Sequence, residues 1–258
     1  MAITAIILFT CFVGWLTYNF RKTKPVLSPS FTLIYRTILS GKVNFYNQLS
    51  GDDKTTFEKR MLHFLSRVKI TGVNCMVEDE DRVLVAASAI IPIFGFLNWE
   101  YNNLNEVLLY PEPFNKDFNM AESEDKSILG MVGSGAMQYV MILSQPSLRE
   151  GFSNKAETGN TGIHEFVHLL DKTDGAVDGI PENLMDKQYV VPWIKRMHEG
   201  INQIIQNQSD INPYGSVNEA EFFAVVAEYF FQQPNELQSK HPELYEMLQQ
   251  IFRQNPAR

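Results

Sequence analysis

The stretch HEFVHLLD at residues 164–171 contains two histidines four positions apart, a glutamate directly after the first and an aspartate at its end. Asn160 and Thr161 precede it, and both are residue types that cap a helix N-terminus. Gly175 follows it, and glycine commonly ends a helix. The pattern therefore predicts a helix over residues 162–172.

The two histidines of this predicted helix, His164 and His168, are one turn apart and present their rings on one face. This spacing allows two imidazole nitrogens to reach one zinc ion at about 2.0–2.1 Å each. Glu165 is rotated by about 100° from His164 around the helix axis, so it can border the ion without binding it. A general base that acts on zinc-activated water occupies this position. The alternative is a buried helix whose histidines only bond to backbone or carboxylate groups.

A zinc site needs a third protein ligand, and the residues leave several candidates open: Asp171, His198, Glu219, Glu221, Glu228 and His241. Residues 219–232, EAEFFAVVAEYFFQ, predict a strongly apolar helix on which Glu221 and Glu228 face the same way. Carboxylates on a buried helical face are costly unless they are paired or bound to metal, so this helix is the best physical source of the ligand. Asp171 lies on the face of His164, but its side chain is short, and holding a histidine N–H is the easier role for it.

The rest of the chain predicts an α+β fold, mainly helical with a small β-sheet. Apolar residues recur at helical spacing over residues 31–68, and the chain from about residue 161 onward is mostly helical. Residues 73–83 predict a strand that leads into an acidic turn, and residues 106–110 and 137–144 predict two further strands. The strand at 137–144 is either an edge that pairs with an extended peptide or an interior strand. Residues 83–97 are apolar but too short for a membrane span, and they contain Pro92, so they predict a buried core helix broken at the proline.

The N-terminus predicts a single transmembrane helix. Residues 2–20 are uncharged and mostly apolar, and Arg21, Lys22 and Lys24 follow them. Basic residues on this side place the main domain in the cytoplasm. The expected organisation is a membrane anchor at residues 1–24, a juxtamembrane linker at 25–34 and a zinc metallopeptidase domain at 35–258. A cleaved signal peptide is the alternative.

Composition narrows the function classes. The chain of 258 residues has a formal net charge of −8 and a pI near 5.2, which argues against a nucleic-acid partner. It contains two cysteines, Cys11 and Cys75, and the first lies in the predicted membrane segment, so a disulfide framework is excluded. A zinc site in this chain must therefore be built from histidines and carboxylates.

Three motifs together resemble the Mlc titration factor A family of zinc peptidases, which is related in its catalytic region to anthrax lethal factor. They are HEFVHLLD, the downstream YG…NEAEFFAVVAEYFF and the upstream NEVLLYPEPF, and the similarity covers roughly residues 35–252. The resemblance implies a zincin-like fold with Zn²⁺ bound by His164, His168 and Glu221. It further implies Glu165 as the base, Tyr214 as an assisting residue at the metal, and Asp171 and Glu228 as supports for the ligands.

The function expected from these features is zinc-dependent hydrolysis of peptide bonds, with a peptide or protein as substrate. The resemblance implies an aminopeptidase. The first alternative is a non-catalytic, membrane-tethered regulatory protein that binds a transcriptional repressor or another partner and uses zinc as a structural element. The second is a metal-free helical interaction module.

Overall fold

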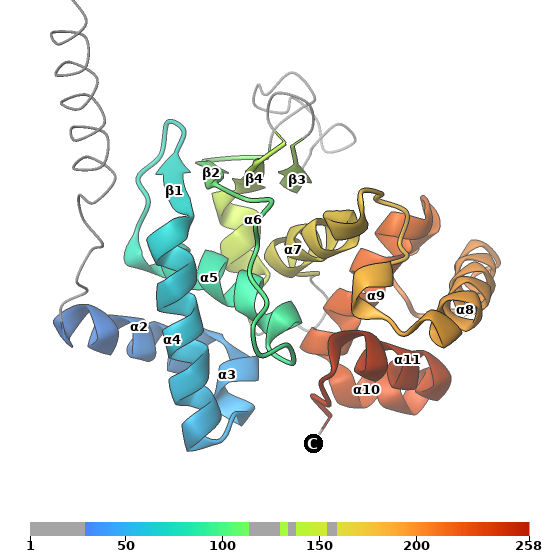
Figure 1. Cartoon of the computed structure of the whole chain (residues 1–258). Coiled ribbons are helices and arrows are strands. Elements are labelled where there is room, and N and C mark those ends of the chain that lie inside the picture. The colour runs from blue at the N-terminus through green and yellow to red at the C-terminus, as the bar shows by residue number, and fades with distance from the viewer. Residues whose placement is uncertain (1–28, 114–129, 134–137, 154–158, 258) are drawn as a thin grey trace, which may run out of the picture. The chain divides into compact units, whose positions relative to one another are not determined.

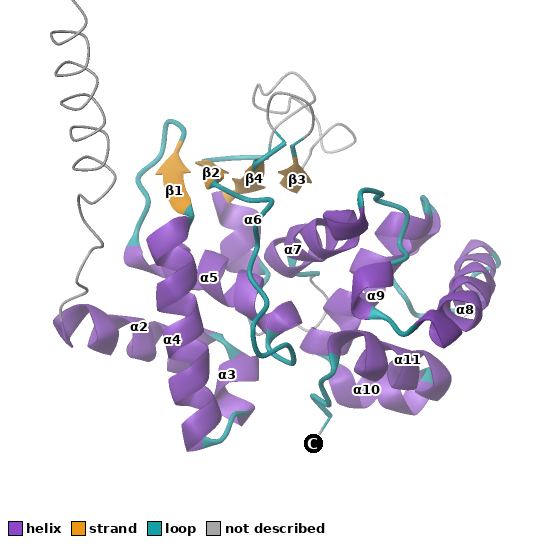
Figure 2. Ribbon diagram, in the orientation of Figure 1, coloured by secondary structure: helices purple, strands orange, loops and turns teal. Residues whose placement is uncertain are grey.

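The structure, a computed structural model, describes residues 29–113, 130–133, 138–153 and 159–257. It is mainly helical with a small sheet, as the sequence predicts (Figures 1 and 2). The first half contains helices α2 (Pro29–Lys42), α3 (Asn44–Gln48), α4 (Gly51–Arg67), α5 (Asp79–Ile93) and α6 (Gln145–Glu150), with strands β1 (Lys69–Gly72), β2 (Glu106–Tyr110), β3 (Gly130–Val132) and β4 (Val140–Ser144). The second half contains α7 (Thr161–Asp171), α8 (Lys187–Ile205), α9 (Glu219–Gln232), α10 (Pro234–Lys240) and α11 (Pro242–Phe252), with 3₁₀ helices η3 (Lys172–Asp174), η4 (Glu182–Leu184) and η5 (Pro213–Ser216).

The four described strands form one sheet in the order β1-β2-β4-β3. β1 and β2 pair in parallel, as do β2 and β4, whereas β3 is antiparallel to β4. The stretch predicted as a strand at 137–144 is therefore the interior strand β4, and its alternative assignment as an edge is wrong. β3, which the sequence did not predict, lies at the edge of the sheet beside α7 (Figure 1).

The predicted strand at residues 73–83 is wrong. β1 ends at Gly72, and α5 begins at Asp79. The acidic residues Asp79, Glu80 and Asp81 fill the first turn of α5, where carboxylates favour a helix start. The Glu78 backbone N–H donates to the Asp81 carboxylate at 2.8 Å, which closes this first turn. The acidic run is a helix N-terminus and not a turn between strands.

The core helix α5 is buried along its apolar part and ends one residue after Pro92, in agreement with the predicted break. α7 packs between α5 and α9, and all its residues from Gly162 to Asp171 are buried. Phe223 and Phe230 of α9 stack on Phe252 of α11. These contacts fix the axis of α9 beside that of α7.

None of the helices that the structure describes is long and apolar enough to cross a membrane. The predicted anchor at residues 2–20 lies outside the described residues. Residues 29–34, predicted as part of a linker, belong to α2. Residues Tyr35–Arg258 form one compact unit.

Candidate metal centre

Helix α7 begins where the sequence predicts. The Asn160 side chain accepts a hydrogen bond from the Ile163 backbone N–H at 3.0 Å, and its own amide donates to the Gly151 carbonyl at 2.8 Å. This cap sets the phase of the helix, so that His164 and His168 face α9. Both histidines are 9% exposed.

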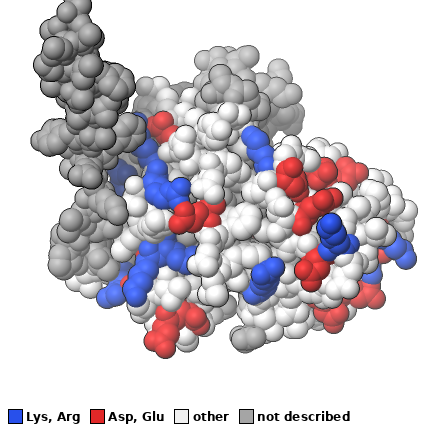
Figure 3. Space-filling view, in the orientation of Figure 1, with Lys and Arg blue, Asp and Glu red and all other residues white. Residues whose placement is uncertain are grey.

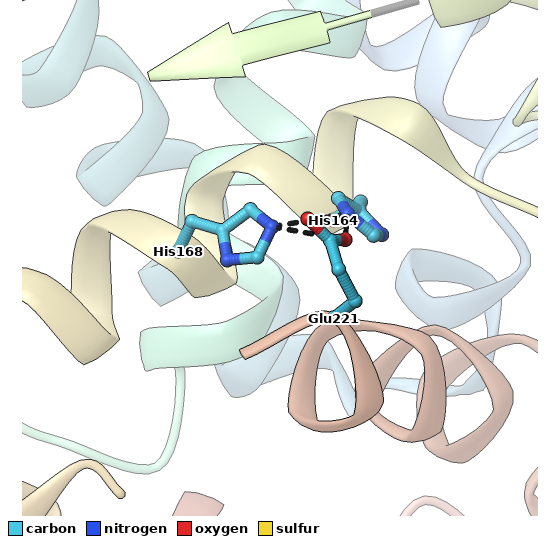
Figure 4. A group of neighbouring side chains, drawn as sticks. All are labelled: His164, His168 and Glu221. Atoms are coloured by element: carbon cyan, nitrogen blue, oxygen red, sulfur yellow. Dashed lines mark hydrogen bonds and ion pairs between the residues drawn. The ribbon is translucent and has the colours of Figure 1, made fainter. Parts of the chain in front are cut away.

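Helix α9 supplies the facing carboxylate. Asn218 caps its N-terminus by accepting from the Glu221 backbone N–H at 2.9 Å, which places Glu221 in the first turn. From there its side chain points at the two histidine rings of α7 (Figure 4). The three residues form a group whose potential ligand atoms converge on one point.

The distances suit a zinc ion. Glu221 Oε2 lies 2.9 Å from His164 Nε2 and 3.4 Å from His168 Nε2, and the two Nε2 atoms are 3.1 Å apart. A tetrahedral zinc site with bonds of about 2.0–2.1 Å separates its ligand atoms by about 3.3–3.4 Å. Two imidazoles and one carboxylate are also the donor set of several catalytic zinc sites. The residues present therefore fit zinc without rearrangement of either helix.

Glu228, two turns further along α9, contacts His164 from the other side of its ring. Its Oε1 accepts from His164 Nδ1 at 2.7 Å, and its Oε2 accepts from the Asn160 backbone N–H. Because Nδ1 carries the proton for this bond, Nε2 is the nitrogen that would lose its proton and offer its lone pair when a metal binds. Glu221 and Glu228 thus both contact His164, but only Glu221 also reaches His168.

The charges at the centre are strongly coupled. Burial opposes the charged form of His164, but hydrogen bonds to Glu221 and Glu228 outweigh it and hold the pKa of this imidazole well above its usual value. Burial likewise raises the pKa of Glu221, but the two histidines overcome this and lower it to about 2. Glu221 is therefore an anion at neutral pH, as a metal ligand must be.

Glu165 lies beside this group and not within it. It is 5% exposed, and burial raises the pKa of its carboxyl. The edge strand β3 passes directly over its side chain, so that a Cβ added at Gly130 would lie 2.6 Å from Glu165 Cγ and 2.7 Å from Oε1. Gly130 is the site residue that sequence reasoning missed, because nothing near it in the chain indicates a contact with residue 165.

Tyr214 lies on the open side of the centre. It belongs to η5, which Asn212 caps by accepting from the Tyr214 backbone N–H at 3.0 Å. Its ring centroid is 5.9 Å from that of His164, and its side chain is about half exposed. Burial is the largest cause that raises the pKa of this phenol, followed by the negative charge of Glu221. The structure therefore brings Tyr214 to the site in its neutral, hydrogen-bond-donating form.

Asp171 is fully buried but does not hold a histidine as predicted. Its Oδ2 accepts from the Gly179 backbone N–H at 2.8 Å, while its Oδ1 and His168 Nδ1 have no hydrogen-bond partner among the described residues. Gly179 adopts the left-handed conformation, with φ of 76°, and its carbonyl accepts from Trp193 Nε1 at 2.7 Å. Asp171 thus fixes the loop that leaves α7. Burial raises the pKa of its carboxyl to about 6.

The other candidate ligands lie outside the centre. His198 pairs with Glu219 at 3.4 Å in an exposed position. His241 pairs with Asp210 at 2.6 Å, and Asp210 also bonds Tyr229 and Lys240. These histidines pair with carboxylates away from the three residues of the centre.

Comparison with known proteins assigns the chain to a family. A model of the glucose-regulated metallo-peptidase M90 family matches residues 17–253. The chain belongs to this family. An uncharacterized protein of Synechocystis is 30% identical over 230 residues, which cover 84% of this chain and 82% of the relative. Mlc titration factor A of Escherichia fergusonii is 30% identical over 228 residues, 81% of this chain and 82% of that protein. Mlc titration factor A of Salmonella arizonae is 30% identical over 216 residues, with coverages of 77% and 81%.

Membership of the M90 family confirms the resemblance drawn from the three sequence motifs, and makes this a metallopeptidase-type protein. The family implies a divalent metal, and the His164, His168 and Glu221 group is the one place among the described residues where such donor atoms converge. Beside this group lie Glu165, which is buried, and Tyr214, which is about half exposed.

Proposed function

We propose that the chain is a zinc-dependent peptidase that removes N-terminal residues from peptides or proteins. The observation that carries this proposal is the convergence of three ligand atoms from α7 and α9 beside a buried carboxylate that is not one of them. When bound, zinc would polarise the scissile carbonyl and lower the pKa of water to about 7. The aminopeptidase reaction rests on the family resemblance, since no described feature of the site selects a free N-terminus.

Each surrounding residue has a chemical role in this proposal. Glu165 takes a proton from the attacking water and later delivers it to the leaving amine. Burial of this carboxyl supports the role, because a raised pKa brings the base closer to neutral pH. Tyr214 donates a hydrogen bond from its phenol to the developing oxyanion. Glu228 keeps the His164 ring oriented with Nε2 toward the metal.

The edge strand β3 is suited to hold the substrate. The Gly133 N–H donates to the Val140 carbonyl at 2.9 Å, and in an antiparallel ladder hydrogen-bonded pairs alternate with non-bonded pairs. Gly130 and Val132 therefore turn their N–H and carbonyl groups away from β4, toward the edge. An extended peptide added at this edge would pass over Glu165.

The first test is Glu165→Gln. We expect this variant to keep one zinc per chain and to lose hydrolysis of amino-acid and peptide amides, because the amide cannot accept the proton. Glu219→Gln, on the exposed start of α9, is the matched control and should retain wild-type turnover. Unchanged turnover in Glu165→Gln would contradict the proposed peptidase reaction. Absence of zinc in wild-type protein purified without added metal would favour the metal-free interaction module.

A regulatory partner is a second proposal, supported by relatives named Mlc titration factor A. The partner we propose is a repressor protein of the kind that gives these relatives their name. Purified Mlc and the full chain should form a complex in analytical ultracentrifugation. If Glu165→Gln binds Mlc as well as the wild type does, binding and catalysis are separate functions, whereas no complex with either protein would contradict the partner.

We also propose that residues 2–20 anchor the chain in a membrane, with the catalytic domain in the cytoplasm and no nucleic-acid partner. Net charge of −8 supports the last point, and acidic side chains interrupt the lysines and arginines that gather near α4 in Figure 3. The full chain should stay with the membrane fraction after alkaline extraction, whereas a variant that lacks residues 1–24 should be released. A mature N-terminus near residue 20 would indicate a cleaved signal peptide instead.

A further inference from the structure

The backbone of β3 approaches Glu165 so closely that residue 130 has no room for a side chain. A Cβ at this position would lie 2.6 Å from Glu165 Cγ, 2.9 Å from Cδ and 2.7 Å from Oε1. Carbon atoms in favourable contact are about 3.5–4.0 Å apart. Glycine weakens the interior of a strand, and its presence there often marks a close approach by another group. The contact between Gly130 and the proposed base is such an approach.

The position of β3 over α7 is fixed at a second point. Lys172, directly after α7, donates from Nζ to the Gly133 carbonyl at 2.8 Å. β3 and the residue that follows it therefore contact α7 and its C-terminal end at two points, one at Glu165 and the other at Lys172.

From these contacts we infer that Gly130 is a positioning residue for Glu165: the bare backbone of the edge strand confines the glutamate side chain to the place from which its carboxylate meets the attacking water. This inference rests on the proposed peptidase function. It gives position 130 a role that neither metal binding nor the packing of the sheet requires. The three atoms nearest to a Cβ at this position belong to Glu165 and none to His164, His168 or Glu221.

The chemical nature of the contact predicts how alanine at this position would act. The three atoms nearest to the added Cβ all belong to the glutamate side chain and none to backbone. The side chain can rotate away, so the fold should tolerate the substitution. To restore an ordinary contact, Glu165 Cγ must retreat by roughly 1 Å. A displacement of this size at a reacting group lowers the rate by about 10²-fold.

The test compares Gly130→Ala with Gly51→Ala, at a position where an added Cβ meets no atom within 4 Å. For Gly130→Ala we expect kcat to fall about 10²-fold, with little change in KM, in zinc content or in the thermal midpoint. Gly51→Ala should match the wild type in all four. A crystal structure of Gly130→Ala should show the Glu165 carboxylate displaced while the three ligand side chains superimpose on those of the wild type. An unchanged kcat or an unmoved Glu165 would overturn the inference.

A double-mutant cycle with Glu165→Asp separates positioning from a general loss of stability. Aspartate is one methylene shorter than glutamate and withdraws from β3. Gly130→Ala should therefore lower kcat by a much smaller factor in the Glu165→Asp variant than in the wild type. Losses in kcat that simply multiply would contradict the inference. If the wild type hydrolyses nothing, the proposed function fails, but the crystal structure of Gly130→Ala still decides whether residue 130 sets the position of Glu165.

Discussion

Substitution of Glu228 by glutamine tests which of the two α9 carboxylates, Glu221 or Glu228, binds the metal and which one supports a ligand. Both Glu228 oxygens accept hydrogen bonds, one from His164 Nδ1 at 2.7 Å and one from the Asn160 backbone N–H. A bond to a charged group contributes about 1.5–3 kcal/mol, against about 0.5–1.5 kcal/mol for a neutral one. Glutamine keeps one acceptor oxygen, so one of the two bonds is lost, and the other loses its charge and weakens by about 1–1.5 kcal/mol.

Part of this loss will appear in zinc binding, because His164 binds zinc best when its ring is fixed and its Nε2 is made more basic by the carboxylate. Removal of such a partner typically lowers metal affinity 10–100-fold, or about 1.4–2.8 kcal/mol. Glu221→Gln should be more severe than this, because it removes the one carboxylate that reaches both His164 and His168.

The assay is competition for zinc with a chromophoric chelator of known affinity at pH 7.5. Zinc affinity should fall in the order wild type, Glu228→Gln, Glu221→Gln. Glu219→Gln serves as the control because its exposed carboxylate pairs with His198, away from the centre. Equal affinity of Glu228→Gln and wild type would refute the supporting role. A greater loss in Glu228→Gln than in Glu221→Gln would make Glu228 the ligand and reverse the assignment.

Three further substitutions test other parts of the structure. Tyr214→Phe should lower kcat by about 10²-fold or more at unchanged zinc content, as expected for loss of an oxyanion donor; equal kcat values would leave the tyrosine only a packing role. Asp171 has a folded-state pKa of about 6, above the unfolded value of about 3.9, so its ionisation should destabilise the metal-free protein as pH rises from about 4 to 6. The free energy of unfolding of Asp171→Asn, measured in urea relative to that of the wild type, should therefore be about 2–3 kcal/mol higher at pH 7 than at pH 4. A difference between the two proteins that does not depend on pH would contradict the effect of burial. Arg149→Met should lower stability by about 3–5 kcal/mol, because it leaves the buried Asp81 carboxylate without the guanidinium 2.7 Å away, and adding Asp81→Asn should recover part of the loss in thermal unfolding.

Features that depend on neighbouring residues could be predicted from the sequence. The bounds of α7 follow from its cap and periodicity, and the convergence of His164 and His168 follows from their spacing. The apolar composition of 219–232 also identified α9 as the source of the facing carboxylate. The choice between Glu221 and Glu228 could not be made from spacing, since both face α7. It depends on which imidazole nitrogen each carboxylate meets, and that is set by the packing of α7 against α9.

Features that depend on distant pairing were missed or assigned wrongly. β3 has three residues, of which Gly130 is the first, and Gly133 follows directly, so no alternating pattern marks it. The acidic run in the first turn of α5 resembled a turn between strands because its capping role depends on the helix that it begins. Asp171 was assigned to a histidine on helical spacing, but the loop at Gly179 returns to this carboxylate and takes one of its oxygens. For β3 and for Asp171 the partner that decides the outcome comes from another segment.

The arrangement of Glu165 and the three ligand residues favours catalysis over a structural role for the metal. A structural zinc site is closed by four protein ligands, whereas a catalytic site keeps a position open. The group at α7 and α9 provides three ligand residues within the described chain. Beside them Glu165 is buried with a raised pKa, and no ion pair to it is found among the described residues. A buried carboxylate of this kind costs stability and contributes nothing to holding the metal. Its place beside Gly130 of β3 is explained if its function is to exchange a proton with the attacking water.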